Sequence, residues 1–396
     1  MRRLAVLSTL ASLALPVVSV AALNGNPEEN LRILESIPLF QNYEKRVSGE
    51  DDKAETLVEI FTKIQNEGRT RVLERGTHSK GSCFNGELKV LSAQEIKAIS
   101  KSDDVTIARV RQGLFSREGV LPTTVRFANA KGQTNPDTVG DVRGLSLSVD
   151  TTGRGVAVNG DAVQDYMFNS SPMFAVRNIV EFTELLKAAR LAQGDFYFLN
   201  PLYIKSTLRA KNLLEEFERN DTVSYAVESY WSNVPYSHGL KADGSPREIV
   251  KLKMSPCDPS SLRREGSAGK APDYLQKDID LRAARGHVCM VLSAQLFDQK
   301  KIEATGLHSG RKTSDWIENG GELWDEKTLP FVPVARLTIT GDDASAVTSS
   351  KKFSCETFAI STLIHSQRGH QPLGSLARVR SIVEENSRAR RMNEKR

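Results

Sequence analysis

Five segments of the chain have the residue pattern of β-strands. Residues 86–90, 145–149 and 250–254 alternate apolar with polar side chains, which is typical of a strand with one buried face. Residues 288–297 and 332–339 are rich in β-branched or bulky residues, which also indicates strands. No strand–helix–strand alternation with a glycine-rich turn is found, so the pattern disfavours a Rossmann sheet.

Three segments instead place apolar residues at helical spacing. They are residues 55–65, 179–193 and 376–391. The second is the best signalled, because Asn178 is a suitable N-cap and Gly194 follows its end. The chain shows no internal repeat.

The N-terminal segment differs from the rest of the chain. Arg2 and Arg3 precede an uncharged, mostly apolar run at 4–23 that ends in small residues. This pattern is typical of a secretory signal peptide, which we assign to residues 1–21, with a secreted mature chain following. The alternative is an uncleaved membrane anchor, for which the run is just long enough. Residues 22–396 are expected to form one domain.

Composition and charge are those of an ordinary globular protein. The 396 residues include 54 Lys and Arg against 49 Asp and Glu, a net charge of +5, and 39% are hydrophobic. Seven basic and three acidic residues from Arg378 onward carry +4, and Arg2 and Arg3 carry +2, which leaves about −1 for the remainder. A nucleic-acid-binding surface is therefore not expected. The basic tail is interpreted as a solvated helix end, with a partner-binding tail as the alternative.

Secretion changes the interpretation of the cysteines and of two sequons. The cysteines contain no C-x-x-C pair, so a zinc knuckle is not indicated. One or two disulfides in any pairing, or buried free thiols, remain open. Asn169 and Asn220 each begin an N-x-S/T sequon, which predicts a glycoprotein. The four cysteines are Cys83, Cys257, Cys289 and Cys355.

Common catalytic signatures are missing from the chain. It has no G-x-x-x-x-G-K-[ST], no H-E-x-x-H and no G-x-S-x-G, and its six histidines do not pair at metal-ligand spacing on one helix. The sequence therefore gives no support to a P-loop nucleotide hydrolase, a zinc protease or a serine hydrolase.

Six segments, in order along the chain, resemble the catalase family. The first resembles the E-R-x-x-H-x-K-G motif of the distal histidine, and the last two are similar to the C-terminal part of the smaller catalase-like proteins of bacteria and of fungal biosynthetic gene clusters. This resemblance implies an α+β fold, an eight-stranded antiparallel β-barrel with surrounding helices and a haem pocket, with its core at about 70–391. The segments are 74–81, 124–127, 141–147, 164–174, 330–335 and 370–380.

The resemblance also implies roles for individual residues. His78 takes the position of the distal base, which moves a proton between the two oxygens of a peroxide. Arg75 and Arg126 take the positions of arginines that contact the haem propionates. Arg380 takes the position of the arginine beside the proximal iron ligand.

The proximal ligand itself departs from the family pattern. The family motif R-x-x-x-Y is here Arg380-Ser-Ile-Val-Glu384, so a carboxylate stands where the phenolate is expected. Glu384 is therefore the candidate metal ligand, with His365 or His370 as substitutes. The competing interpretation is a surface ion pair between Arg380 and Glu384, which are four residues apart on a helix.

The distal asparagine departs as well. Counting back from Pro172, the family's N-x-P asparagine falls on Ser170, and Asn169 lies one residue early. One residue reverses the face of a strand side chain. The sequence therefore favours Ser170 over the iron, and a bulge would be needed to restore Asn169.

Together these observations predict a catalase-like, haem-dependent oxidoreductase. Its substrate is expected to be a peroxide or a small organic molecule, and the resemblance to the biosynthetic-cluster proteins suggests secondary-metabolite biosynthesis. Neither nucleic acid nor, after signal cleavage, a membrane is expected as a partner, whereas a homo-oligomer is allowed. The alternative is a haem-free pseudoenzyme that uses the catalase fold as a binding or accessory protein.

Overall fold

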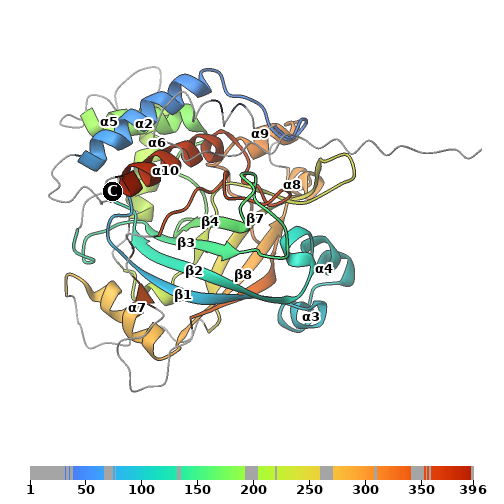
Figure 1. Ribbon diagram of the computed structural model, residues 1–396. Coiled ribbons are helices and arrows are strands. Elements are labelled where there is room, and N and C mark those ends of the chain that lie inside the picture. The colour runs from blue at the N-terminus through green and yellow to red at the C-terminus, as the bar shows by residue number, and fades with distance from the viewer. Residues whose placement is uncertain are drawn as a thin grey trace, which may run out of the picture.

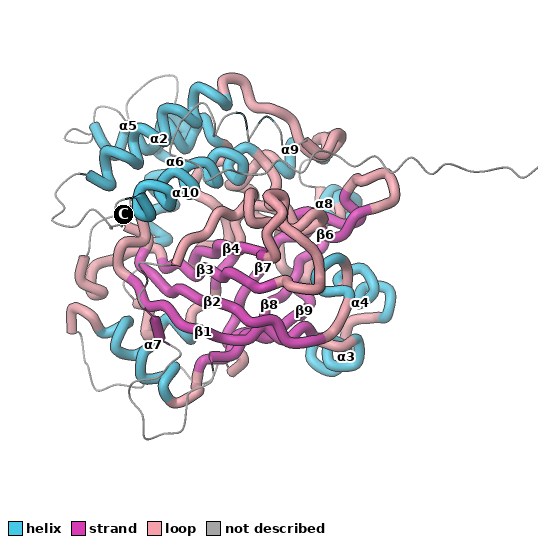
Figure 2. Tube along the Cα trace, viewed as in Figure 1, coloured by secondary structure: helices cyan, strands magenta, loops and turns pink. Residues whose placement is uncertain are grey.

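Eight antiparallel strands close into a barrel in the computed structural model of the chain (Figures 1 and 2). Each strand pairs with the next along the path β1-β2-β3-β4-β5-β7-β8-β9, and β9 returns to β1. The α+β barrel expected from the sequence is therefore confirmed. Its strands are β1 (Gly81–Val90), β2 (Gly119–Asn129), β3 (Arg143–Asp150), β4 (Val163–Asn169), β5 (Tyr230–Trp231), β7 (Pro246–Pro256), β8 (Val288–Leu296) and β9 (Phe331–Ile339).

Strand β1 closes the barrel by pairing with three partners. It pairs with β2 over its whole length and with β9 through Glu87–Val90. The remaining edge, at Cys83 and Phe84, pairs with the two-residue strand β10 (Lys352–Phe353). A further short strand, β6 (Tyr236–Leu240), pairs with β7 outside the closed path.

The two faces of the barrel wall follow the alternation in the sequence. On β3, Leu145, Leu147 and Val149 are fully buried in the hydrophobic core, and Ser146 between them lies on the opposite face. All five predicted strands are present, and the structure extends most of them. The first, predicted at 86–90, begins five residues earlier.

Four helices pack together over one side of the barrel (Figures 1 and 2). The three predicted helices are among them, and Asn178 caps α5 as expected, since its Oδ1 accepts hydrogen bonds from the Val180 and Glu181 amides. The four are α2 (Glu50–Asn66), α5 (Ile179–Leu191), α6 (Ile204–Phe217) and α10 (Ser375–Asn393). The others are α3 (Ala93–Ser100), α4 (Asp104–Val110), α7 (Tyr274–Ala284), α8 (Gln299–Glu303) and α9 (Thr313–Ile317).

The four cysteines form two disulfides. Cys83 of β1 is bonded to Cys355, which is 272 residues away in the sequence. Cys257, at the end of β7, is bonded to Cys289 of the adjacent strand β8. The pairing that the sequence left open is thereby decided, and no free thiol remains.

The basic C-terminal helix is not the solvated helix end that the charge count suggested. Arg378 and Arg391 are 2% and 4% exposed, Arg378 against carboxylates of other segments and Arg391 in the cavity described below. Only tertiary packing reveals this, because arginines near a helix end are usually solvated. The interpretation as a surface tail is wrong for these two residues.

The structure describes most of the chain, and two sequence predictions lie outside it. These are the signal peptide at 1–21 and the sequon at Asn220. Within the described part, no helix is long and apolar enough to cross a membrane. The described residues are 39–66, 77–131, 135–191, 204–218, 221–258, 271–306, 310–339 and 358–393, together with Arg32, Glu35, Arg75, Lys352, Phe353 and Cys355.

Candidate functional site

A cavity of about 300 Å³ lies between the barrel wall and the covering helices. Side chains from the outer face of β2, β3 and β4 form one wall, and α2, α5, α6 and α10 supply the other. Most of the lining is aliphatic or aromatic. Six of the seven site residues predicted from the sequence line this cavity, namely Arg75, His78, Arg126, Asn169, Arg380 and Glu384.

His78 lies immediately before β1 in a constrained position. Its φ is +54°, and its amide donates a hydrogen bond of 2.9 Å to the Ala130 carbonyl. A Cβ on Gly144 would lie 2.7 Å from His78 Cε1, so the ring requires a glycine on the neighbouring strand. Burial, reinforced by the charges of Arg126, Arg380 and Arg75, lowers the pKa of His78 to about 3. The imidazole is therefore neutral at physiological pH.

Asn169, rather than Ser170, faces the cavity. Met167 and Asn169 both line it, as expected for two residues on one face of β4. Asn169 Nδ2 donates to Asn233 Oδ1 at 2.8 Å, and Asn169 Oδ1 is buried without a hydrogen bond. Ser170 lies beyond the strand end, where its Oγ accepts a hydrogen bond from the Arg143 amide at 2.9 Å.

The placement of Ser170 over the cavity is thus corrected. Strand β4 is regular as far as Asn169, which pairs with Gly144 of β3. Compared with the family's N-x-P spacing, one more residue separates Asn169 from Pro172, and it lies in the bend after the strand. The sequon at Asn169 is also affected, because this residue is only 9% exposed. A buried amide of this kind is not available for glycosylation in the folded protein.

Arginine side chains make the cavity positive. Arg75 Nη2 donates to the carbonyl of Cys355 at 2.5 Å and also to that of Phe358, and Arg126 Nη2 donates to the carbonyl of His78. Burial lowers the pKa of Arg126 to about 10 and that of Arg75 well below its usual value. An anion bound beside these guanidinium groups would act in the opposite direction and favour their charged form.

Arg391 completes this set, although sequence reasoning counted it only as part of the basic tail. It lines the same cavity, and its Nη1 lies 3.4 Å from the Phe358 carbonyl. Burial lowers its pKa to about 10. Arg391 follows Glu384 by seven residues, which is about two helical turns. This spacing is the sequence signal that could have placed both residues on one helix face.

Glu384 and Arg380 form the ion pair that the sequence offered as the alternative to a metal ligand. Arg380 Nε lies 3.3 Å from Glu384 Oε1. The pair is not on the surface, however, because both side chains line the cavity and are 14% and 10% exposed. The predicted ion pair is therefore present, but it lies in the cavity and not on the surface, and metal binding by Glu384 stays a prediction.

One oxygen of Glu384 is held firmly and the other is not. Oε2 accepts hydrogen bonds from the Thr362 amide at 2.9 Å and from Thr362 Oγ1 at 3.1 Å. Oε1 is buried and accepts no hydrogen bond. Burial raises the pKa of Glu384 to about 7, although Arg380 and Thr362 act in the opposite direction.

The two histidines considered as substitute ligands do not line the cavity. His365 Nδ1 lies 2.9 Å from Asp165 Oδ2, and this contact outweighs burial to raise the pKa of His365. His370 Nε2 accepts a hydrogen bond of 2.6 Å from the Leu114 amide. Each ring is thus engaged elsewhere.

The cavity fits a group of the kind that the resemblance implies. Its walls are mainly apolar, as a porphyrin requires, and Arg75, Arg126 and Arg391 are placed to hold carboxylates. The buried, unsatisfied Glu384 Oε1 is an oxygen donor suited to Fe(III). Among the described residues no cluster of three or more His, Cys, Asp or Glu could hold a bare metal ion.

Comparisons with known proteins find catalases. Residues 40–195 match the family model described as Catalase. The chain is 24% identical over 235 residues to a catalase of Latilactobacillus sakei, covering 56% of this chain and 44% of the relative. It is 29% identical over 132 residues to a catalase of Pseudomonas aeruginosa strain PAO1, covering 33% of this chain and 22% of the relative.

Solved structures share the fold over a larger part of the chain. Catalase A from Saccharomyces cerevisiae superposes with a TM-score of 0.53 at 17% identity, covering 83% of this chain and 62% of its own. A fungal catalase superposes with a TM-score of 0.52 at 19% identity, covering 78% and 57%. The chain spans less than half the length of each of these two curated catalases.

Proposed function

Because this chain belongs to the catalase family, we propose that it is a haem-dependent oxidoreductase that acts on a peroxide. The observation that carries the proposal is the arrangement around one cavity. Neutral His78 and Asn169 lie on the barrel side, and the unsatisfied carboxylate oxygen of Glu384 lies on the α10 side. These are the two sides from which a planar cofactor would be held.

The residues of the chain have separable tasks in this proposal. Haem, when bound, supplies an iron at which the O–O bond of a peroxide is weakened. Arg75, Arg126 and Arg391 would bind its carboxylates, and Glu384 Oε1 would supply an oxygen ligand.

Proton transfer falls to His78. Because the ring is neutral, it accepts the proton of one peroxide oxygen and returns it to the other, which makes O–O cleavage heterolytic. The side-chain amide of Asn169, with Oδ1 free of internal hydrogen bonds, orients the substrate. The surrounding apolar side chains exclude water.

A haem titration followed by absorbance tests the proposal. The native chain should develop a Soret band that persists through desalting, and Glu384→Ala should weaken or shift it. Glu385→Ala is the matched control, because this neighbour on α10 pairs with Arg388 and does not line the cavity. His78→Ala should retain the band and lose peroxide turnover. No band under any loading condition would contradict haem dependence.

A haem-free binding protein is the second candidate. It is favoured by one observation, the 3.3 Å contact of Arg380 with the same Glu384 oxygen that a metal would need. In that case Glu384→Ala and the native chain would both fail to bind haem. A band that is insensitive to Glu384→Ala would keep haem and exclude Glu384 as its ligand.

The same proposal includes the localisation and the biological role of the protein, both of which rest on the sequence. Secretion is supported by the signal-like segment at 1–21, and a role in secondary-metabolite biosynthesis by the resemblance of 330–335 and 370–380. An organic substrate in place of hydrogen peroxide would suit the apolar lining. The family also makes a homo-oligomer plausible.

A further inference from the structure

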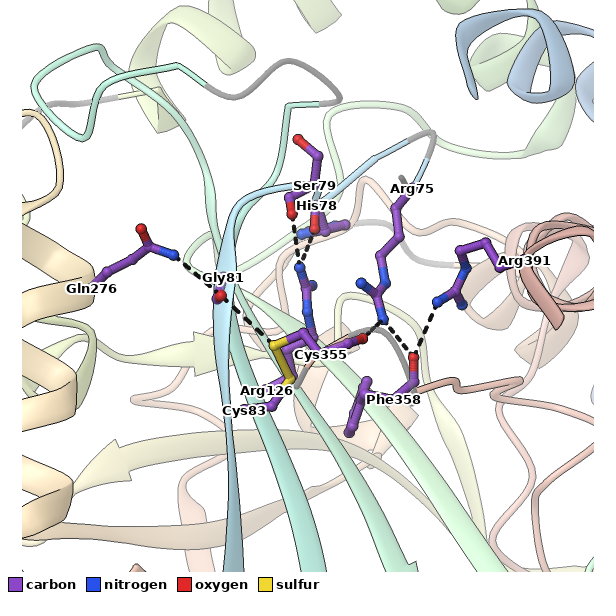
Figure 3. Close-up of a disulfide and its surroundings, with 10 residues drawn as sticks. All are labelled: Arg75, His78, Ser79, Gly81, Cys83, Arg126, Gln276, Cys355, Phe358 and Arg391. Atoms are coloured by element: carbon purple, nitrogen blue, oxygen red, sulfur yellow. Dashed lines mark hydrogen bonds between the residues drawn. A yellow bond between two sulfur atoms is a disulfide. The ribbon is translucent and has the colours of Figure 1, made fainter. Parts of the chain in front are cut away.

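The Cys83–Cys355 disulfide lies beside the positive end of the cavity (Figure 3). Cys355 begins a segment that reaches the cavity wall at Phe358, Ala359 and Ile360. Figure 3 shows Arg75 and Arg391 converging on the Phe358 carbonyl, with Arg75 also bonded to the carbonyl of Cys355 itself. The residue that forms the disulfide thus also supplies a hydrogen-bond acceptor to a cavity arginine.

On the N-terminal side of this segment, the attachment to the barrel that the described residues show is a short ladder. Lys352 and Phe353 of β10 pair with Phe84 and Cys83 of β1. On the C-terminal side the segment is anchored again at Ser361, whose amide donates to Asp165 Oδ2 at 2.8 Å. The covalent bond at Cys355 therefore fixes the start of the stretch that contains the two acceptor carbonyls.

The second disulfide has a different setting and serves as an internal comparison. Cys257 and Cys289 join strands that are already paired from Val250 to Pro256, and the Cys257 amide donates to the Cys289 carbonyl at 3.0 Å. Neither cysteine lines the cavity. Its loss would affect the barrel edge without moving a cavity residue.

We propose that the Cys83–Cys355 disulfide is a positioning element of the cavity, which holds the Cys355 and Phe358 carbonyls where they orient Arg75 and Arg391. The two guanidinium groups have like charge and share one acceptor, so their arrangement depends on where that acceptor lies. Among the described residues, the backbone attachments to the barrel that would remain without the covalent bond are the two ladder residues and the downstream anchor at Ser361. The positioning role does not depend on which anion the arginines bind.

Two double variants separate positioning from general stabilisation. In C83S/C355S, hydrogen–deuterium exchange should accelerate at least about tenfold in a peptide covering 358–365, because its upstream tether is lost. The matched control C257S/C289S should leave this peptide unchanged and accelerate exchange at the ends of β7 and β8. Unchanged exchange at 358–365 in C83S/C355S would overturn the proposal.

A binding measurement supplies the second readout. The dissociation constant of C83S/C355S for haem should rise about tenfold, since oriented arginines are lost, whereas C257S/C289S should lower the melting temperature and leave the dissociation constant unchanged. Equal dissociation constants for all three proteins would also overturn the proposal. If the native chain binds no haem, the proposed function fails, and the exchange experiment still decides the positioning role.

A folding defect in C83S/C355S would not remove the test. In that case the native chain is treated briefly with a phosphine reductant, and cleavage of each disulfide is quantified by alkylation. Each reduction adds two electrons and two protons to the bond and gives two thiols, while the phosphine becomes its oxide. Exchange at 358–365 should increase in proportion to reduction of Cys83–Cys355, and independence of that reduction would contradict the proposal.

Discussion

Two arginines on helix α10, only two residues apart, illustrate two uses of a buried charge. Arg378 is surrounded by carboxylates, with contacts of 2.6 Å to Glu50, 2.7 Å to Glu44 and 3.2 Å to Glu318. Arg380 has an ion pair of 3.3 Å with Glu384, but its Nε and Nη2 are buried without a hydrogen bond. Buried polar groups are normally satisfied, so under the proposed function this incomplete set is the one that a bound ligand would complete.

The different surroundings follow from helix geometry. Residues two apart on an α-helix point about 200° away from each other. Arg378 therefore faces the segment before and at the start of α2 and the end of α9, whereas Arg380 faces the cavity. The cluster of Arg378 with its three carboxylates, here called the saturated cluster, fixes the helix in place. The Arg380–Glu384 pair, whose hydrogen bonds are incomplete, is here called the unsaturated pair.

The largest expected effect comes from breaking the saturated cluster. Arg378→Ala leaves three buried carboxylates without their cation and should lower the free energy of unfolding by about 3–5 kcal/mol. Urea denaturation measures this change. Arg390→Ala, on the same helix with an exposed contact to Asn66, is the control and should change stability by less than about 0.5 kcal/mol. Similar losses of unfolding free energy in Arg378→Ala and Arg390→Ala would show that the saturated cluster does not fix the helix.

The raised pKa of Glu384 in the unsaturated pair should be visible in the way the stability of the protein depends on pH. Glu384 has a folded pKa of about 7 against an ordinary 4.5, so its contribution to stability is fully present below pH 4.5 and is lost as pH rises through 7. Relative to Glu384→Gln, which does not titrate, the native chain should lose up to about 3 kcal/mol over this range. Denaturation of both proteins from pH 4.5 to 8 measures the difference. A constant difference would show that Glu384 is ionised throughout.

A smaller effect is expected from the residue that holds Glu384. Thr362→Val removes the Oγ1 hydrogen bond and keeps the amide, which should raise the pKa of Glu384 further and cost about 1 kcal/mol at pH 8. Carboxyl NMR of labelled glutamate follows the titration directly. Thr362→Ser retains the hydroxyl and should titrate like the native chain. If both variants titrate alike, the hydroxyl has no part in holding the carboxylate.

Much of the fold was predictable because local pattern and final environment agree. The alternation at 145–149 corresponds to β3, and Asn178 caps α5 as its side chain suggests. The two-residue strand β5 (Tyr230–Trp231) and strand β10 were not predictable, since so short a segment carries no periodicity. Their place in the sheet is set by their partners.

The candidate site was predictable where a motif includes several spaced side chains. His78 and Arg75 lie in one such motif, and both line the cavity. The choice between Asn169 and Ser170 depended on where an offset of one residue is absorbed, which the residue types do not reveal. Arg391 was missed because a basic residue near a helix end is most often solvated.

The sequence by itself determined the types of most elements, the catalase-family motifs and the replacement of the expected tyrosine by Glu384. Tertiary structure alone decided that Cys83 pairs with Cys355, that the Arg380–Glu384 pair lies in a cavity, and that Arg391 lies there too. The physical reason is the same in each case. Burial and hydrogen-bond partners come from segments far apart in the chain, and these set charge, pKa and availability for a ligand.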